Sequence, residues 1–310
     1  MALLITIIFC AVWYVPLLVK HRKLEKAILP DTEREPFKWY VFAFLLGCAA
    51  FVAALIIQTL FSNLIANVKL TGAVREIFGF FKIMIAVATV EETVKFLAGY
   101  LILRNKTGLT EVATMLIMAA AGVGFELFES ALNTNAIAAI ARGVFALHIL
   151  WQLVMGKFWY RARQAKAAGN TVAYKKNLAI AFGVPIISHG LFDYPVLKVQ
   201  ALQQENVAVS DFLKVFLLCL SLAVGIVYAI FAVIAVARTM KAEKAVLMMR
   251  ATGLVSEDDA DSREPLYGRK NLSLGRNLFT PYTVLWVKGA GEALLRANGP
   301  ATQSIRRIRI

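Results

Sequence analysis

The sequence predicts an all-α fold, a polytopic membrane helix bundle of about seven transmembrane helices with the N-terminus outside and the C-terminus inside. Hydrophobic residues make up 59% of the 310 residues, against about 45–50% in soluble domains, and the mean hydropathy is +0.65. The apolar residues are gathered into runs close to the roughly 20 residues with which a helix crosses a bilayer. The loops between these runs alternate in charge.

Seven apolar runs follow one another along the chain. The first has no basic residues before it and no small-residue cleavage site after it, so we interpret it as a retained helix rather than a signal peptide. The runs cover about residues 2–19, 39–66, 77–103, 112–133, 137–160, 178–197 and 212–236.

The first, third and fifth connecting loops are basic, whereas the second, fourth and sixth contain few basic residues. Loops rich in Lys and Arg stay in the cytoplasm, which places these three loops and the C-terminal end inside. We therefore divide the chain into a transmembrane domain, residues 1–238, and a partly flexible cytoplasmic tail, residues 239–310.

The net charge of +14 does not indicate a nucleic-acid partner, because membrane topology explains most of the basic residues. The cysteines Cys10, Cys48 and Cys219 all lie in apolar runs. Their spacing indicates neither a disulfide framework nor a metal site, and we expect them to be small buried hydrophobic residues.

Charged residues inside the third run are its most informative feature. Glu91, Glu92 and Lys95 lie near its middle, where insertion of one ionised side chain costs about 2.5–3.5 kcal/mol. Glu91 and Lys95 are four residues apart and can pair on one helix face, while Glu92 points about 100° away. Such a carboxylate can act as a general base that activates water. The alternative is a buried structural network.

The fourth run carries two more carboxylates, Glu126 and Glu129. Phe125 and Glu129 are four residues apart and share a helix face, with Glu126 close to it. The small residues 119–124 would allow a neighbouring helix to approach closely, which would bring Glu129 towards the third run. Structural pairing across helices is again the alternative.

Two of the three histidines lie within apolar runs. His148 is in the middle of the fifth run, and His189 is followed four residues later by Asp193. This carboxylate can hold the imidazole in one tautomer. Hydrogen-bonded packing is the alternative for both histidines. His21 lies in a basic loop, where we expect it to be solvated.

Taken in order, these residues resemble the PrsW family of intramembrane proteases, which belongs to a larger group with the CAAX proteases and the bacteriocin-processing membrane proteases. The resemblance covers about residues 79–195, the motif core of the transmembrane domain. Four motifs carry it: E-E-x-x-K at Glu91, Glu92 and Lys95, F-x-x-x-E at Phe125 and Glu129, His148, and H-x-x-x-D at His189 and Asp193. No single motif is specific for the family, but the occurrence of all four in this order, each within a membrane run, is. Two features depart from the family pattern: Ser130 follows the second-motif glutamate where Asn is usual, and Glu126 is an additional carboxylate.

The resemblance implies that the chain is a hydrolase, an endopeptidase that cleaves a peptide bond in or near the membrane. One glutamate of the Glu91/Glu92 pair, helped by Glu129, would activate water. His148 and His189 would stabilise the oxyanion or bind a metal. Asp193 would orient His189. The supporting residues would be Lys95, Phe125 and Glu126.

We expect a glutamic mechanism that requires no cofactor. The ligand types also suit zinc, with Glu91, Glu129, His148 and His189 as candidates, although the sequence contains no H-E-x-x-H. The implied partners are the lipid bilayer and a membrane protein or peptide substrate, such as an anti-sigma factor, in a bacterial or archaeal cell membrane.

Two other functions remain open at this point. The first is a non-catalytic membrane scaffold on the same fold. The larger group includes a non-catalytic scaffold subunit, so membership does not guarantee activity. A proton-coupled transporter would also use intramembrane Glu and His, but the inverted repeats common in transporters are not evident in the sequence.

Overall fold

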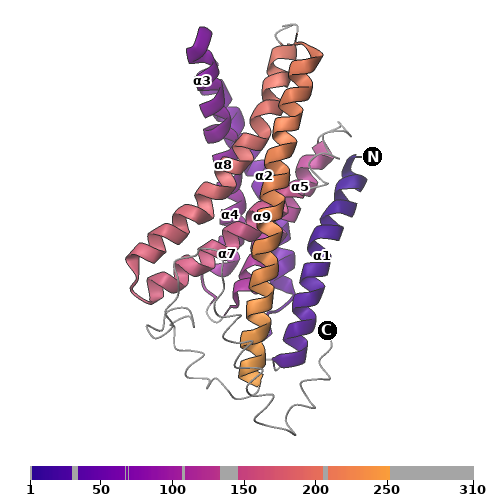
Figure 1. Cartoon of the computed structure of the whole chain (residues 1–310), viewed down its shortest axis with the longest axis vertical. Helices are drawn as coiled ribbons and strands as arrows, with labels where there is room; N and C mark the ends of the chain where they lie inside the picture. The colour runs from indigo at the N-terminus through magenta and orange to yellow at the C-terminus, as the bar shows by residue number, and fades with distance from the viewer. Residues whose placement is uncertain are drawn as a thin grey trace.

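The computed structural model describes residues 2–29, 34–66, 68, 70–106, 109–132, 146–204 and 209–251. Every regular element within these residues is a helix, which confirms the predicted all-α fold (Figure 1). The elements are α1 Ala2–Ile28, α2 Lys38–Ile65, α3 Gly72–Lys82, the π-helix η2 Ile83–Thr89, α4 Val90–Leu103, α5 Glu111–Leu132, α7 Leu147–Ala167, α8 Thr171–Gln204 and α9 Asp211–Ala251.

Five helices of the described chain are long and apolar enough to cross a membrane: α1, α2, α5, α8 and α9. The two other expected spans correspond to the continuous helical segment α3–η2–α4 and to α7. Both carry several charged side chains, because α4 contains the E-E-x-x-K motif and the C-terminal half of α7 is basic. The arrangement is a polytopic helix bundle, as predicted.

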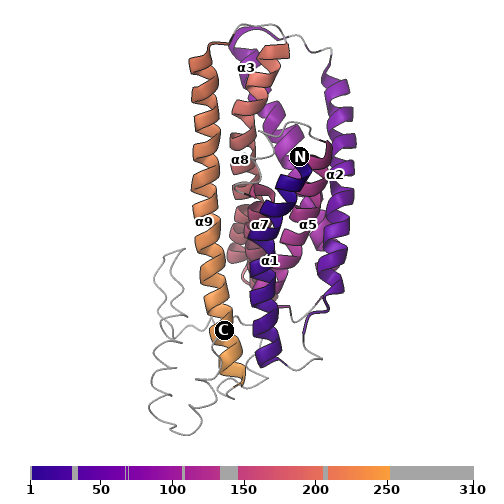
Figure 2. The same ribbon diagram turned by 90° about the vertical axis from the view of Figure 1, so that its right-hand side faces the viewer.

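Helices α5 and α7 form the centre of the bundle, with α2 and α9 on opposite sides of it (Figure 2). Every residue from Glu111 to Glu126 of α5 and from Leu147 to Trp159 of α7 is buried. A helix that is enclosed on all sides in this way occupies the interior of a membrane bundle. The two central helices carry four of the nine predicted site residues.

Small residues allow the helices around α5 to approach closely. A Cβ atom on Gly124 would lie 2.1 Å from the carbonyl oxygen of Phe44 in α2, and one on Gly122 would lie 2.6 Å from that of His148 in α7. The run of small residues at 119–124 therefore brings α2 and α7 against α5, as small-residue helix interfaces do in membranes.

The outer helices expose large apolar side chains, with Leu64 of α2 79% exposed and Phe212 of α9 80% exposed. Apolar surface on this scale marks contact with a membrane or a partner. On the outer faces of apolar helices long enough to span a bilayer, it is the surface that meets lipid.

Helix α8 continues through two prolines, Pro185 and Pro195, and bends along its course (Figure 1). A proline within a helix removes one backbone donor and disturbs the turn before it. The hydroxyl of Ser188 donates to the carbonyl oxygens of Val184 at 2.8 Å and Pro185 at 3.0 Å. His189 follows directly, so the irregular turn positions a predicted site residue.

Two sequence-based expectations are wrong in detail. His21 is buried, not solvated, because α1 continues to Ile28 and α9 continues to Ala251. Its ring nitrogens lie 3.2 Å from Glu25 and 3.3 Å from Glu243. His148 is the second residue of its helix rather than a mid-helix residue, because Ala146 has a φ of 44° and ends the helical backbone there. Residues 252–310, most of the expected tail, lie outside the described part of the chain.

Candidate active site

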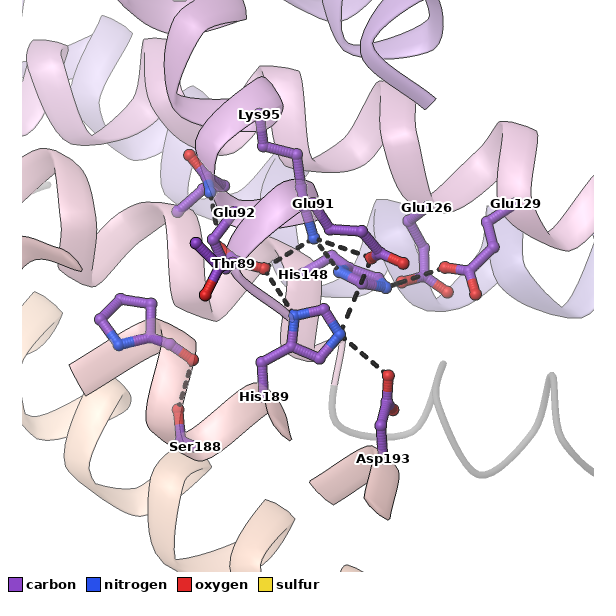
Figure 3. Close-up of polar contacts among 12 residues, drawn as sticks. Thr89, Glu91, Glu92, Lys95, Glu126, Glu129, His148, Ser188, His189 and Asp193 are labelled. Carbon is purple, nitrogen blue, oxygen red and sulfur yellow. Dashed lines mark hydrogen bonds and ion pairs between the residues drawn. The ribbon is translucent and has the colours of Figure 1, made fainter. Parts of the chain in front are cut away.

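All nine predicted site residues converge on one region between α4, α5, α7 and α8, most of them shown in Figure 3. Glu92, Lys95, Phe125, Glu126, His148 and His189 are at most 4% exposed, and Glu91 is 8% exposed. The side chains of Glu129 and Asp193 are 19% and 22% exposed. The cluster is therefore buried at its centre and open towards these two carboxylates.

The π-helix η2 lies directly before the paired glutamates. Its wider turn leaves the carbonyl of Met84 to accept a hydrogen bond from the Thr89 hydroxyl at 2.8 Å. Single π-helical turns of this kind occur frequently at functional sites. Here η2 sets the direction from which α4 begins, and so the direction in which Glu91 and Glu92 point.

Both carboxylate oxygens of Glu92 are occupied. Oε1 accepts hydrogen bonds from Lys95 Nζ at 2.7 Å and lies 2.9 Å from His189 Nδ1. Oε2 accepts one from Gln152 Nε2 at 2.9 Å. A buried carboxylate with three partners on three helices is well suited to fix the positions of those partners.

Glu91 is held by only one of its oxygens. Oε1 accepts a hydrogen bond from Gln58 Nε2 at 3.1 Å. Oε2 is buried and has no hydrogen-bond partner among the described residues; Lys95 Nζ is 3.5 Å away and His189 Nε2 is 3.7 Å away. This oxygen is available to a ligand, a water or a substrate.

His148 connects the two pairs of glutamates. Its Nδ1 lies 2.6 Å from Lys95 Nζ, and its Nε2 lies 2.9 Å from Glu129 and 3.5 Å from Glu126. An ammonium group only donates, so with Lys95 protonated Nδ1 accepts and Nε2–H donates to Glu129. The tautomer of this histidine then follows from its neighbours.

His189 lies between two carboxylates and under an aromatic ring. Nδ1 faces Glu92, while Nε2 is 3.1 Å from Asp193, the residue expected to orient it. The indole of Trp151 stacks on the imidazole at 4.1 Å between ring centres. Carboxylates on both sides and a stacked ring restrict the imidazole to one orientation.

Sequence reasoning missed several residues of this region. Gln58 and Tyr228 carried no signal, because their helices lie far away in the chain, and Trp151 was visible only as one helical turn after His148. Besides Glu91 Oε2, three buried polar atoms beside the cluster have no hydrogen-bond partner among the described residues: Trp151 Nε1, Gln152 Oε1 and Tyr228 Oη. Buried polar atoms usually form hydrogen bonds. Those without one beside the cluster are therefore candidates to bind water or a polar group of a substrate.

A family model described as PrsW family intramembrane metalloprotease matches residues 35–236, more than half of the chain. The chain belongs to the PrsW family. It is an integral membrane protease, and the matched range contains the whole cluster from Gln58 to Tyr228. Comparison with curated proteins and with solved structures finds no match. The description as a metalloprotease does not support the expected preference for a glutamic mechanism without metal.

The ligand chemistry of this PrsW chain fits a metal ion. Glu91, His148 and His189 each offer one atom within 4.8 Å of the others, and Glu126, Glu129 and His148 form a second such group. Two imidazoles and one carboxylate are a known ligand set of catalytic zinc. The 3.7 Å between Glu91 Oε2 and His189 Nε2 is close to the roughly 3.4 Å that separates two ligands of a tetrahedral zinc ion. In the first group, Glu91 Oε2 is buried and has no hydrogen-bond partner among the described residues.

Proposed function

We propose that this chain hydrolyses a peptide bond of a membrane-anchored protein at the position bounded by Glu91 Oε2 and His189 Nε2. The observation that carries the proposal is the buried Oε2 of Glu91, which has no hydrogen-bond partner among the described residues and lies 3.7 Å from an imidazole nitrogen. The substrate class that the family resemblance implies is a membrane-anchored regulator such as an anti-sigma factor.

In this proposal Glu92 is a positioning residue rather than the reacting group. Both of its oxygens are already engaged by Lys95, His189 and Gln152. It holds His189 by Nδ1, so that Nε2 faces Glu91 and Asp193. It also holds Lys95, whose charge offsets that of the buried glutamates.

Glu129 and Asp193 lie at the more exposed side of the cluster and are suited to exchange protons with water. Glu129 can receive a proton during attack and return it to the leaving amine, since it is within 2.9 Å of His148. General acid–base help of this kind contributes about 10²–10⁴-fold to a rate. Asp193 holds His189 in the orientation that the reaction needs.

A metal ion would be held by Glu91, His148 and His189. Such an ion would supply an activated water and polarise the scissile carbonyl. The family description and the ligand set support this version.

One observation favours a second version, in which Glu91 itself is the base that activates water. The ammonium group of Lys95 lies 2.6 Å from His148 Nδ1 and 3.5 Å from Glu91 Oε2. A positive charge is therefore already present beside two of the three candidate ligand residues, and it disfavours a nearby cation.

Cleavage of single-pass membrane proteins, including a membrane-anchored anti-sigma factor, by the full chain in proteoliposomes tests the function. We expect Glu91→Gln to lower the cleavage rate by about 10²–10⁴-fold. Glu76→Gln should leave the rate unchanged, because Glu76 is on α3, paired with Lys198 outside the cluster. Full activity of Glu91→Gln would contradict the proposal.

Metal analysis of the same preparation distinguishes the two versions. One equivalent of zinc that is lost together with activity on chelation, and lost from Glu91→Gln, supports the metal-bound site. Full activity of a metal-free preparation supports Glu91 as the base.

A further inference from the structure

A cavity of about 540 Å³ opens where the C-terminal ends of α4 and α7 meet the N-terminal part of α8. None of the residues that line it belongs to the candidate active site. The residues that matter for its chemistry are Tyr100, Arg104, Trp159, Arg163, Lys166 and Tyr174.

Three of these side chains are cationic, and no acidic residue lines the cavity. The guanidinium of Arg163 donates to the carbonyl oxygens of Leu103 at 3.1 Å and Lys106 at 3.0 Å, which fixes it in place at the end of α4. Neither Arg104 nor Lys166 forms an ion pair with a described carboxylate. The cavity therefore carries positive charge that the described residues leave uncompensated.

Aromatic rings form the walls between these cations. Arg163 lies over the ring of Trp159 at 4.9 Å, and Lys166 Nζ is 5.7 Å from the ring centre of Tyr174. Trp159 is 6% exposed. Aromatic residues beside Lys and Arg are typical of the depth at which the headgroups of a bilayer lie.

The cavity lies at the end of the bundle that carries the basic third and fifth loops, the cytoplasmic end by the positive-inside rule. Anionic lipids of the cytoplasmic leaflet attract basic residues, and basic pockets between transmembrane helices bind their headgroups. A solvated basic loop would account for the charge alone. It would not account for a cavity in which the cations are set among aromatic walls.

We propose that this cavity binds the phosphate group of an anionic phospholipid from the cytoplasmic leaflet. Arg104 and Lys166 provide the charge-assisted hydrogen bonds, and Arg163 with Trp159 forms a fixed wall. A soluble phosphate is the other source of the same chemistry. Because Arg163 joins the end of α4 to α7, a bound headgroup would also steady the two helices that carry Glu91, Glu92 and His148.

Native mass spectrometry of the full chain in detergent, titrated with phosphatidylglycerol or phosphatidylcholine, tests the proposal. The double variant Arg104→Gln/Lys166→Gln removes two cavity cations but keeps Arg163. The matched control, Lys175→Gln/Lys176→Gln, removes two exposed charges from the same end of α8 that do not line the cavity.

We expect the wild-type chain to prefer phosphatidylglycerol. The cavity variant should bind this lipid about 30-fold more weakly than the control does, because it loses two charge-assisted contacts. The same titration with inorganic phosphate separates the sources. Selective loss of lipid binding in the cavity variant assigns the site to a headgroup, and selective loss of phosphate binding alone assigns it to a soluble phosphate. Equal binding by both double variants, of lipid and of phosphate, would overturn the proposal.

Discussion

At the scale of residues, Glu91 and Glu92 are neighbours in the chain but differ in what surrounds them. Glu92 is completely buried and has a donor at each oxygen, whereas Glu91 keeps one oxygen without a hydrogen bond among the described residues. Two adjacent positions on a helix point about 100° apart, so different helices surround them. This difference is the basis for proposing a positioning role for Glu92 and a reacting role for Glu91.

The stability of two variants should reflect this difference. Glu92→Gln removes the charge that compensates Lys95, which is itself completely buried. Breaking a buried pair by removing one partner costs about 3–5 kcal/mol, so thermal unfolding in detergent should shift to a markedly lower temperature. Glu91→Gln should unfold close to the wild-type temperature, because Gln58 can still donate to the amide oxygen. Equal shifts for the two variants would contradict the assignment.

Asp193→Asn should weaken cleavage without abolishing it. The variant keeps the shape of the side chain that lies 3.1 Å from His189 Nε2 but loses its charge. Replacement of a carboxylate that orients a catalytic or ligating histidine typically costs about 10–100-fold. A rate measured in proteoliposomes that equals the wild-type rate would mean that His189 is oriented by Glu92 and Trp151 alone.

The sequence could identify these residues because pairs four apart on a helix lie on one face. It did so for Glu91 with Lys95 and for His189 with Asp193. It could not identify Gln58, or the choice between Glu91 and Glu92, because these depend on which helices pack together. That packing is decided by side-chain shape across residues far apart in the chain.

At the scale of elements, the close approach of α2 to α5 depends on a missing side chain. Gly124 faces the carbonyl oxygen of Phe44 at a distance that leaves no room for a Cβ atom. The same interface holds Phe51 against Phe125 at 5.3 Å, and Phe125 lies 4.2 Å from Lys95 Nζ. The helix contact and the site therefore share one set of residues.

Gly124→Ala should separate α2 from α5 and lower stability by about 1–3 kcal/mol, the usual cost of overpacking. The matched control is Gly183→Ala in α8, where nothing lies within 4 Å of the added atom. There the change should be neutral or stabilising by up to about 1 kcal/mol, because alanine favours a helix over glycine. Thermal unfolding of both variants in detergent measures the difference, and equal effects would exclude a tight contact at Gly124.

The order of the helices could be predicted from hydropathy, but several of their ends and the irregular elements could not. Each of the seven expected runs corresponds to a helical segment in its described part. Hydropathy does not reveal the π-helix η2 or the start of α7 at Leu147. Both lie inside continuous apolar runs, in which the hydropathy does not change.

At the scale of the whole molecule, the unequal lengths of the helices define the depth of the site. The upper end of α5 lies below the upper ends of α8 and α9 (Figures 1 and 2). His148 at the start of α7 contacts Glu129 near the end of α5 and Lys95 in α4. Glu129 therefore lies at the depth of the α4 glutamates, because α5 ends within the bundle rather than at its edge.

The orientation of this bundle in the membrane follows from its charges and can be measured. Lys175 near the start of α8 and Ser210 just before α9 are both exposed and lie at opposite ends of α8. The basic residues gather at the Lys175 end, which the positive-inside rule places in the cytoplasm.

In a background without Cys10, Cys48 and Cys219, a membrane-impermeant maleimide should label Ser210→Cys in intact cells. It should label Lys175→Cys only after the membrane is permeabilised. Labelling of Lys175→Cys in intact cells would mean that the bundle has the opposite orientation in the membrane. The basic cavity would then face the outer leaflet. The two proposals would then separate, because the cluster around Glu91 depends only on contacts within the bundle, whereas the lipid site depends also on which leaflet supplies anionic headgroups.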